Sequence, residues 1–82
     1  SQSQSQKRRE RLSYKEKFEL ENMEENILKL EAEQVRLEGL SQSQEVLLDS
    51  QKLQEVSMDL ARVLSEIEEK YQRWSELSAK EN

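Results

Sequence analysis

Residues 20–37 read LENMEENILKLEAEQVRL, and one stripe of mainly apolar side chains recurs there at alternating intervals of three and four residues. The same spacing returns in residues 53–77, LQEVSMDLARVLSEIEEKYQRWSEL. Such a repeat puts the a and d positions of successive heptads on one face of a helix, which is the pattern of a coiled-coil seam. The first seam consists of Leu20, Met23, Ile27, Leu30, Gln34 and Leu37. The second consists of Leu53, Val56, Leu60, Val63, Ile67, Lys70, Trp74 and Leu77.

The two seams match when the chain folds back on itself near residues 48 and 49. Each a position then meets a d position, as knobs-into-holes packing of antiparallel helices requires. The paired layers are Leu20 with Leu77, Met23 with Trp74, Leu30 with Ile67, and Leu37 with Leu60. The sequence therefore predicts an all-α fold, a two-helix antiparallel coiled-coil hairpin, which is a binding or spacing device.

The composition excludes several protein classes. Of the 82 residues, 38% are charged and 33% hydrophobic, with one glycine and neither proline nor cysteine. This composition suits helices but leaves apolar surface for little more than one seam. We therefore expect a single domain that is either marginally stable alone or helped by weak self-association. The longest apolar run, residues 46–48, is too short for a membrane span or a signal peptide. We expect a soluble, intracellular fragment.

Charge is distributed unevenly along the chain. After an opening run of Ser-Gln repeats, residues 7–11 carry a charge of +3, whereas residues 12–40 and 41–82 carry −4 each. A polar repeat cannot offset its ordering entropy by burial, so residues 1–11 are predicted to form a disordered basic leader. Residues 12–82 form the acidic hairpin. The leader is either an extended linker or an arm that contacts phosphates.

The ends of the first helix have their own signals. Ser13 and Glu16 have the spacing of a capping box, in which each side chain accepts a hydrogen bond from the other residue's amide. Gly39, the only glycine, stands where a left-handed residue would close the helix in a Schellman motif. The first helix is therefore predicted over about residues 14–38.

The connection, residues 40–49, is longer than the two to eight residues or so that usually join helices in a hairpin. Its run of three aliphatic residues, 46–48, is expected to fold over the open end of the seam, because bare aliphatic side chains promote aggregation. An exposed tip that touches a partner is the alternative. Asp49 is predicted to cap the second helix, which spans about residues 50–78.

Two polar residues interrupt the seam. Gln34 stands opposite Val63 and Lys70 opposite Ile27 in the predicted register, where lone polar residues fix register at some cost in stability. Trp74 is expected to pack in the core. Tyr14, beside the basic leader, would pack there too or stack on nucleic-acid bases.

The sequence offers few groups that could carry out catalysis. The chain has no histidine and no cysteine, which excludes their zinc sites and the Ser–His and Cys–His nucleophiles. Carboxylates on exposed helical faces have no pocket that could tune their pKa. A single glycine cannot form a phosphate-cradling loop. We expect no enzymatic activity, no catalytic residue, no metal and no cofactor in the isolated chain.

Two motifs at the ends of the hairpin carry a family resemblance. Residues 12–16 read Leu-Ser-Tyr-Lys-Glu, and residues 71–77 read Tyr-Gln-Arg-Trp-Ser-Glu-Leu. With the coiled-coil spacing between them, residues 7–80 resemble the C-terminal domain of Uup-type ABC-F ATPases. The chain departs from that pattern at Glu24 and Ser50, where proline is frequent in the family.

The resemblance implies a fragment of a larger cytoplasmic protein. That parent would carry two ATP-binding cassettes upstream, which are then one partner of this domain. In the Uup branch this domain is associated with DNA binding, and ABC-F proteins broadly act on ribosomes. DNA is therefore the expected target, ribosomal RNA is the alternative, and no membrane partner is expected.

Folding back also gathers basic residues at one end of an otherwise acidic rod, as a non-specific phosphate clamp requires. The predicted nucleic-acid-binding residues are Lys7, Arg8, Arg9, Arg11, Lys15, Lys17, Arg73 and Lys80. Two further hypotheses stay open: a protein–protein or self-association module, and a spacer that regulates the cassettes or contacts the ribosome. Salt-sensitive DNA binding, concentration-dependent mass and altered ATPase activity of the parent would distinguish the three.

Overall fold

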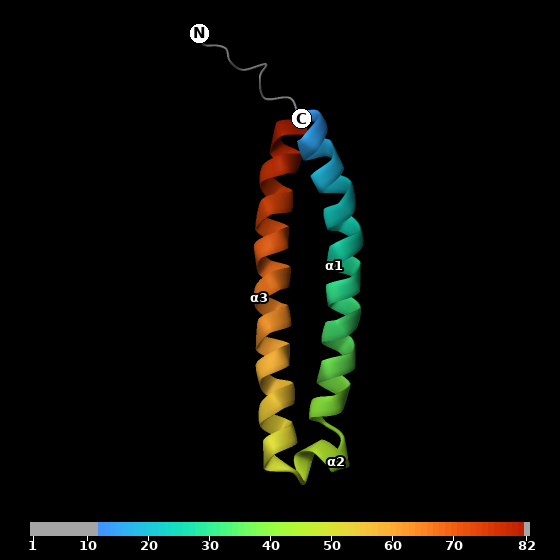
Figure 1. Ribbon diagram of the computed structural model, residues 1–82, viewed down its shortest axis with the longest axis vertical. Coiled ribbons are helices and arrows are strands. Elements are labelled where there is room, and N and C mark those ends of the chain that lie inside the picture. The colour runs from blue at the N-terminus through green and yellow to red at the C-terminus, as the bar shows by residue number, and fades with distance from the viewer. Residues whose placement is uncertain (1–11, 82) are drawn as a thin grey trace.

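Three helices form the described part of the chain, residues 12–81 of a computed structural model. α1 spans Tyr14–Ser41, α2 spans Gln44–Leu47 and α3 spans Ser50–Glu81. α1 and α3 lie side by side in opposite directions, with α2 across the turn between them (Figure 1). The all-α class is confirmed, and the rod measures 62 × 18 × 16 Å. The predicted leader, residues 1–11, lies outside the described residues.

The start of α1 agrees with the sequence prediction. The amide of Glu16 donates to the Oγ of Ser13 at 3.1 Å, and the amide of Ser13 donates to the Oε1 of Glu16 at 3.0 Å. These two bonds form the capping box and satisfy amides that a helix start would otherwise leave without partners. Leu12, just before the cap, is 8% exposed and packs into the core.

The predicted end of α1 is wrong. Gly39 does not have a positive φ, and the helix continues through it to Ser41. The amides of Gln42 and Ser43 instead donate to the carbonyls of Gly39 and Leu40, at 3.2 and 3.0 Å. Bonds of this tighter, 3₁₀-like kind satisfy the last carbonyls without a left-handed residue, so the glycine is not needed as a cap.

The connection holds a helix that the sequence did not predict. The Oγ of Ser43 accepts from the amide of Val46 at 3.3 Å and caps α2. The cap of α3 agrees with the prediction, since Asp49 accepts at Oδ1 from the amides of Gln51 and Lys52, at 3.1 and 3.2 Å. One short helical turn therefore replaces part of the expected loop.

The aliphatic residues of this connection have different surroundings. Val46 is 5% exposed, whereas Leu47 is 56% and Leu48 is 79% exposed. The expectation that all three cover the seam is correct for Val46 and wrong for the two leucines. Successive side chains on a helical turn point about 100° apart, so one turn can direct only one of them inward.

A cluster of buried apolar residues joins the first half of α1 to the C-terminal part of α3. Its buried members are Leu12, Leu20, Met23, Ile27 and Leu77, with Trp74 packed against them. This grouping agrees with the predicted register, which placed Leu20 level with Leu77 and Met23 level with Trp74. Toward the turn, Leu37 and Val63 are buried as well, at 2% and 1% exposure.

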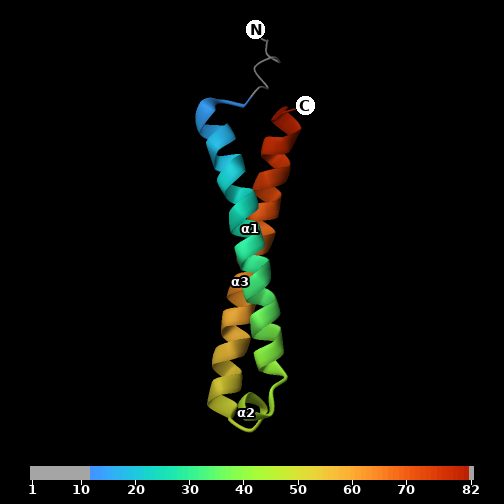
Figure 2. The same cartoon turned by 90° about the vertical axis from the view of Figure 1, so that its right-hand side faces the viewer.

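The long helices cross rather than running strictly parallel to one axis. In the view of Figure 2, α1 lies in front and slants from upper left to lower right across α3. This is the sense of crossing found in left-handed supercoils. We define the terminal half of the rod as residues 12–31 and 66–81, and the turn half as residues 32–65.

Candidate nucleic-acid interface

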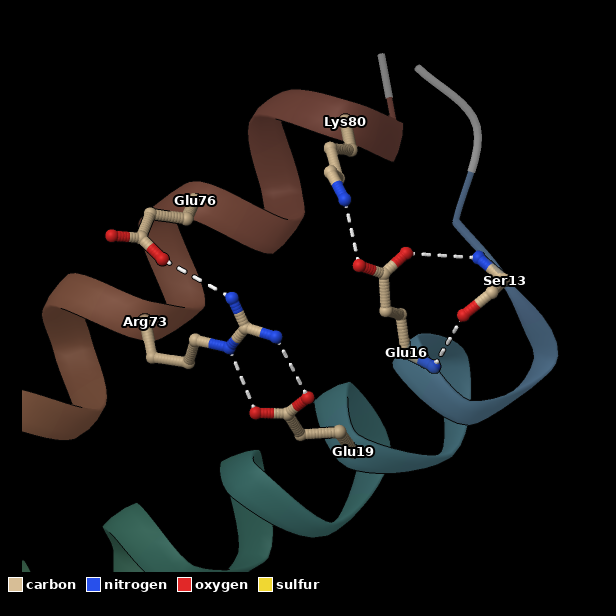
Figure 3. Close-up of polar contacts among 6 residues, drawn as sticks. All are labelled: Ser13, Glu16, Glu19, Arg73, Glu76 and Lys80. Atoms are coloured by element: carbon tan, nitrogen blue, oxygen red, sulfur yellow. Dashed lines mark hydrogen bonds and ion pairs between the residues drawn. The ribbon is translucent and has the colours of Figure 1, made fainter. Parts of the chain in front are cut away.

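The predicted nucleic-acid contacts gather at the end of the rod where α1 begins and α3 ends. Lys15 and Lys17 lie at the start of α1, and Arg73 and Lys80 lie in the C-terminal part of α3. Contacts from Arg73 and Lys80 to α1 bring these two segments together (Figure 3). The remaining predicted residues lie outside the described part of the chain: Lys7, Arg8, Arg9 and Arg11.

Arg73 is held by two carboxylates. Its Nε and Nη2 donate to the two oxygens of Glu19 at 2.8 and 3.1 Å, and its Nη1 donates to Glu76 at 3.2 Å (Figure 3). The flat guanidinium fork matches a carboxylate edge-on, which makes this the strong form of ion pair. The hydrogen bond from Arg73 lowers the pKa of Glu19, and the bonds to both carboxylates raise the pKa of Arg73. Arg73 therefore joins α3 to α1.

Lys80 makes a second connection of the same kind. Its Nζ donates to the Oε2 of Glu16 at 2.6 Å, while the other oxygen of Glu16 accepts from the amide of Ser13 (Figure 3). The hydrogen bond from Lys80 is the main cause that lowers the pKa of Glu16, followed by the bond from the Ser13 amide. One carboxylate thus caps α1 and ties it to the last turns of α3.

Lys15 and Lys17 have different surroundings from Arg73 and Lys80. Both are exposed, and neither forms an ion pair with a residue of the described range. Their ammonium groups are free to meet phosphates as point charges on flexible stems. Residues 12–19 and 73–80 together hold four basic and three acidic side chains. This end is therefore close to neutral by itself, whereas residues 7–11, which precede it in the sequence, carry a charge of +3.

Two of the predicted contacts, Arg73 and Lys80, pair with carboxylates that the sequence pattern was not used to predict. Glu19 directly precedes the seam residue Leu20, and Arg73 directly precedes Trp74, so both occupy g positions of their heptads. Charges that flank a coiled-coil seam commonly pair across the two helices. That pattern could have identified the pair of Glu19 and Arg73 before the structure was known.

The aromatic residues divide into buried and exposed ones. Trp74 is half-buried against the main apolar cluster, as expected. Tyr14 is 85% exposed and does not pack in the core, and Phe18 is 60% exposed one turn further along α1. Both rings lie on the stretch of α1 that carries Lys15 and Lys17. This leaves base stacking as the open alternative for Tyr14.

The sequence of the rod also matches a known protein family. The model of the family described as ABC transporter C-terminal domain matches residues 11–79. The chain belongs to this family. Among curated proteins and among solved structures, no significant match is found.

The family match covers nearly all of the described rod, including both motifs on which the resemblance rested. This ABC transporter C-terminal domain is therefore an accessory domain of an ABC protein. Within the part of the chain that the structure describes, no helix is long and apolar enough to span a membrane.

Proposed function

We propose that this domain is a nucleic-acid-binding accessory domain of a cytoplasmic ABC-F ATP-binding protein. It contacts DNA, or alternatively ribosomal RNA, without sequence preference. The contacts come from residues 7–11 and from Lys15 and Lys17. The observation that supports this most is the exposure of Lys15 and Lys17, which lack ion-pair partners in the described range and directly follow the basic stretch.

The proposal gives Arg73 and Lys80 a positioning role. Their donors are engaged by Glu16, Glu19 and Glu76, so a phosphate would have to compete with carboxylates already in place. These ion pairs hold the end of α3 against the first turns of α1. They thereby fix the surface from which Lys15 and Lys17 project.

The proposal includes antiparallel coiled-coil packing of α1 on α3. The left-handed sense of crossing in Figure 2 supports it, and so does the pairing of Glu19 with Arg73 across the helices.

The proposal also includes a non-catalytic role for the domain itself. The absence of histidine and cysteine from the sequence supports that role, while ATP hydrolysis would belong to the parent's cassettes.

Binding is expected to be weak and sensitive to salt. Residues 12–82 carry a net charge of −8, which repels a polyanion and places the expected dissociation constant at about micromolar or above. Four phosphate contacts would release condensed counterions and give a log–log salt slope of about −3 to −4. The affinity should be similar for different duplex sequences.

The test is a titration of labelled duplex DNA, branched DNA and structured RNA at several salt concentrations. One variant carries Ser at Lys7, Arg8, Arg9 and Arg11. A matched variant carries Ser at Lys29, Arg36, Lys52 and Arg62, which removes the same charge from positions away from the terminal end. We expect the first variant to lose most of the affinity and most of the salt slope, and the matched variant to keep the slope.

Equal affinity for the two variants would contradict contacts through the basic end, because only overall charge would then matter. A further variant, Lys15→Ser with Lys17→Ser, should weaken binding by less than the variant with serine at the four basic residues of the leader. Preference for the branched DNA or for the structured RNA would decide between DNA and ribosomal RNA as the natural target.

A spacer is the second candidate function, and the length of the rod favours it. The molecule extends 62 Å, with Leu47 and Leu48 exposed at the turn. Such a rod could hold that tip against the parent's cassettes or against the ribosome. In the parent protein, Leu47→Ser with Leu48→Ser would then change the ATPase activity, whereas the serine variant of the basic leader would not.

A further inference from the structure

A groove opens between α1 and α3, away from the ion pairs at the terminal end. It has a volume of about 260 Å³. Its lining residues are Glu24, Ile27, Leu28 and Glu31 from α1, and Tyr71 and Trp74 from α3. This volume is below the roughly 300–1,000 Å³ of pockets that enclose drug-sized ligands, so the groove suits a single side chain.

The lining follows from helical spacing. Residues 24, 27, 28 and 31 are separated by three and four positions and therefore share one face of α1. Ile27, at 5% exposure, forms the floor, and Leu28, at 67% exposure, forms an open wall. The two glutamates stand two turns apart on either side of these aliphatic residues.

The aromatic residues of α3 turn their polar atoms toward the two carboxylates. The Oη of Tyr71 donates to the Oε2 of Glu31 at 2.8 Å, and the Nε1 of Trp74 lies 3.5 Å from the Oε2 of Glu24. The remaining ring surface borders the groove. A cavity bounded by aromatic rings and carboxylates attracts cations by two mechanisms, the ring quadrupole and direct charge pairing.

No basic residue of the described range satisfies these carboxylates. Neither Glu24 nor Glu31 forms an ion pair with a lysine or arginine between residues 12 and 80. Arg73, next to Trp74 in the sequence, is engaged by Glu19 and Glu76 instead. Residues 21–31 carry four glutamates and one lysine, so the surroundings of the groove are acidic as well.

We infer that this groove is a docking site for a basic peptide segment of a partner protein, with an arginine as the residue that enters. The alkyl stem of the arginine lies over Ile27 and Leu28. Its guanidinium stacks on the ring of Tyr71 or Trp74 and donates to Glu24 or Glu31. Arginine fits better than lysine because its planar head both stacks on rings and donates in a fork to carboxylates. This site is separate from the proposed nucleic-acid contacts and has the opposite charge.

Trp74 provides a direct reporter, because it is the only tryptophan in the chain and it lines the groove. The probe is an acetylated and amidated peptide of serine and leucine with two arginines three positions apart. The same peptide with citrulline at both arginines is the control, since citrulline keeps the shape and loses the charge. We expect a saturable change in Trp74 fluorescence with the arginine peptide, which weakens as salt is added.

Two pairs of variants test the residues of the groove. Glu24→Gln with Glu31→Gln should lower the affinity for the arginine peptide by about tenfold or more, because charge-assisted bonds to carboxylates are lost. Glu21→Gln with Glu25→Gln makes the same change in net charge on exposed residues outside the groove. That control should bind within about twofold of the unchanged chain, since surface charges beyond the contact act only through screened interactions.

Leu28→Ala keeps the test decisive if the glutamine variant folds poorly. Leu28 is 67% exposed, so its truncation should leave the helix content intact while weakening the peptide. Leu64→Ala, at a 44% exposed leucine outside the groove, is its control. Equal binding of the arginine and citrulline peptides would overturn the inference. So would occupation of the groove by a second copy, seen as a mass that rises with concentration and falls on Leu28→Ala.

Discussion

The terminal half and the turn half of the rod are held together in different ways. Every side-chain hydrogen bond between α1 and α3 in the described residues lies in the terminal half. The donors on α3 are Tyr71, Arg73, Trp74 and Lys80. In the turn half, the ion pairs are local, such as Arg36 with Glu33 and Lys52 with Glu45.

This difference reflects the connectivity of the chain. Near the turn, the connection through α2 already keeps α1 and α3 close, so their contacts close only a small loop of chain. The far ends close a much longer loop and are also the places where helices fray. The terminal half therefore carries the five-residue apolar cluster and the ion pairs, and these also position the candidate nucleic-acid interface.

The largest expected effect is the loss of stability on Leu77→Ala. Leu77 is 0% exposed and belongs to the terminal cluster, so its truncation should cost about 2–5 kcal/mol of unfolding free energy. Leu48→Ala, at a 79% exposed leucine of the turn, should change the stability by about 0.5 kcal/mol or less. Urea unfolding followed by circular dichroism at 222 nm measures both. Similar losses for the two variants would remove the energetic distinction between the two ends.

The second effect is a gain in stability from Gln34→Leu combined with Lys70→Leu. Both residues are half-buried and occupy predicted seam positions, where an apolar side chain packs better than a polar one. Gln34 donates to Glu38 of its own helix at 3.1 Å, so this bond does not join α1 to α3. We expect a gain of about 0.5–2 kcal/mol. Gln34→Leu should contribute more, because its predicted opposite residue, Val63, is 1% exposed. A thermal melt of the two single variants that shows no gain would contradict their assignment to the seam.

The grouping of the apolar residues in the terminal half could be predicted from the sequence because their spacing is strict. Leu20, Met23 and Leu77 fall into one cluster, as the register from residues 20–37 and 53–77 required. The caps at Ser13 and Asp49 were predictable for a similar reason, since each depends on residues at most three positions away.

The predictions from sequence were wrong where more than one local backbone conformation is possible. A glycine can end a helix or continue it, and Gly39 continues α1 because 3₁₀-like bonds close the last turn. The ion-pair partners of the predicted site residues were not foreseen for a different reason. The pairing of Glu19 with Arg73 depends on which face each charge occupies, and counting charges along the chain ignores that face.

The third effect is a dependence of stability on pH, which compares the ion pairs of the terminal half with those of the turn half. Hydrogen bonds from Lys80 and Arg73 lower the pKa of Glu16 and of Glu19 below the ordinary 4.5. The stability that these pairs contribute is therefore present above pH 4.5 and is lost as the pH falls through the lowered values. Glu16→Gln with Glu19→Gln should lower the melting temperature at pH 7, and this difference from the unchanged chain should shrink on acidification.

The matched variant for the turn half is Glu33→Gln with Glu45→Gln. Hydrogen bonds from Arg36 and Lys52 lower the pKa of these carboxylates too, but the partners of both lie nearby in the sequence. We expect a smaller loss at pH 7, because exposed local pairs contribute little. Equal losses in the two double variants would show that the cross-helix pairs do not hold the terminal half together.

The smallest expected effect is a gain in stability on Gly39→Ala, and its sign distinguishes the predicted helix end from the observed one. A left-handed glycine would make alanine destabilising, because a Cβ strains that conformation. Gly39 instead has no positive φ, lies within α1 and has open space where the Cβ would stand. Alanine also loses less backbone entropy on folding, so we expect a gain of about 0.5 kcal/mol, at the low end of the range because the residue lies in the last turn. Urea unfolding measures the change, with Ala32→Gly in the same helix as the reciprocal control. A loss of stability on Gly39→Ala would mean that α1 ends through a special conformation of the glycine. The backbone hydrogen bonds of the last turn would then not be what ends the helix.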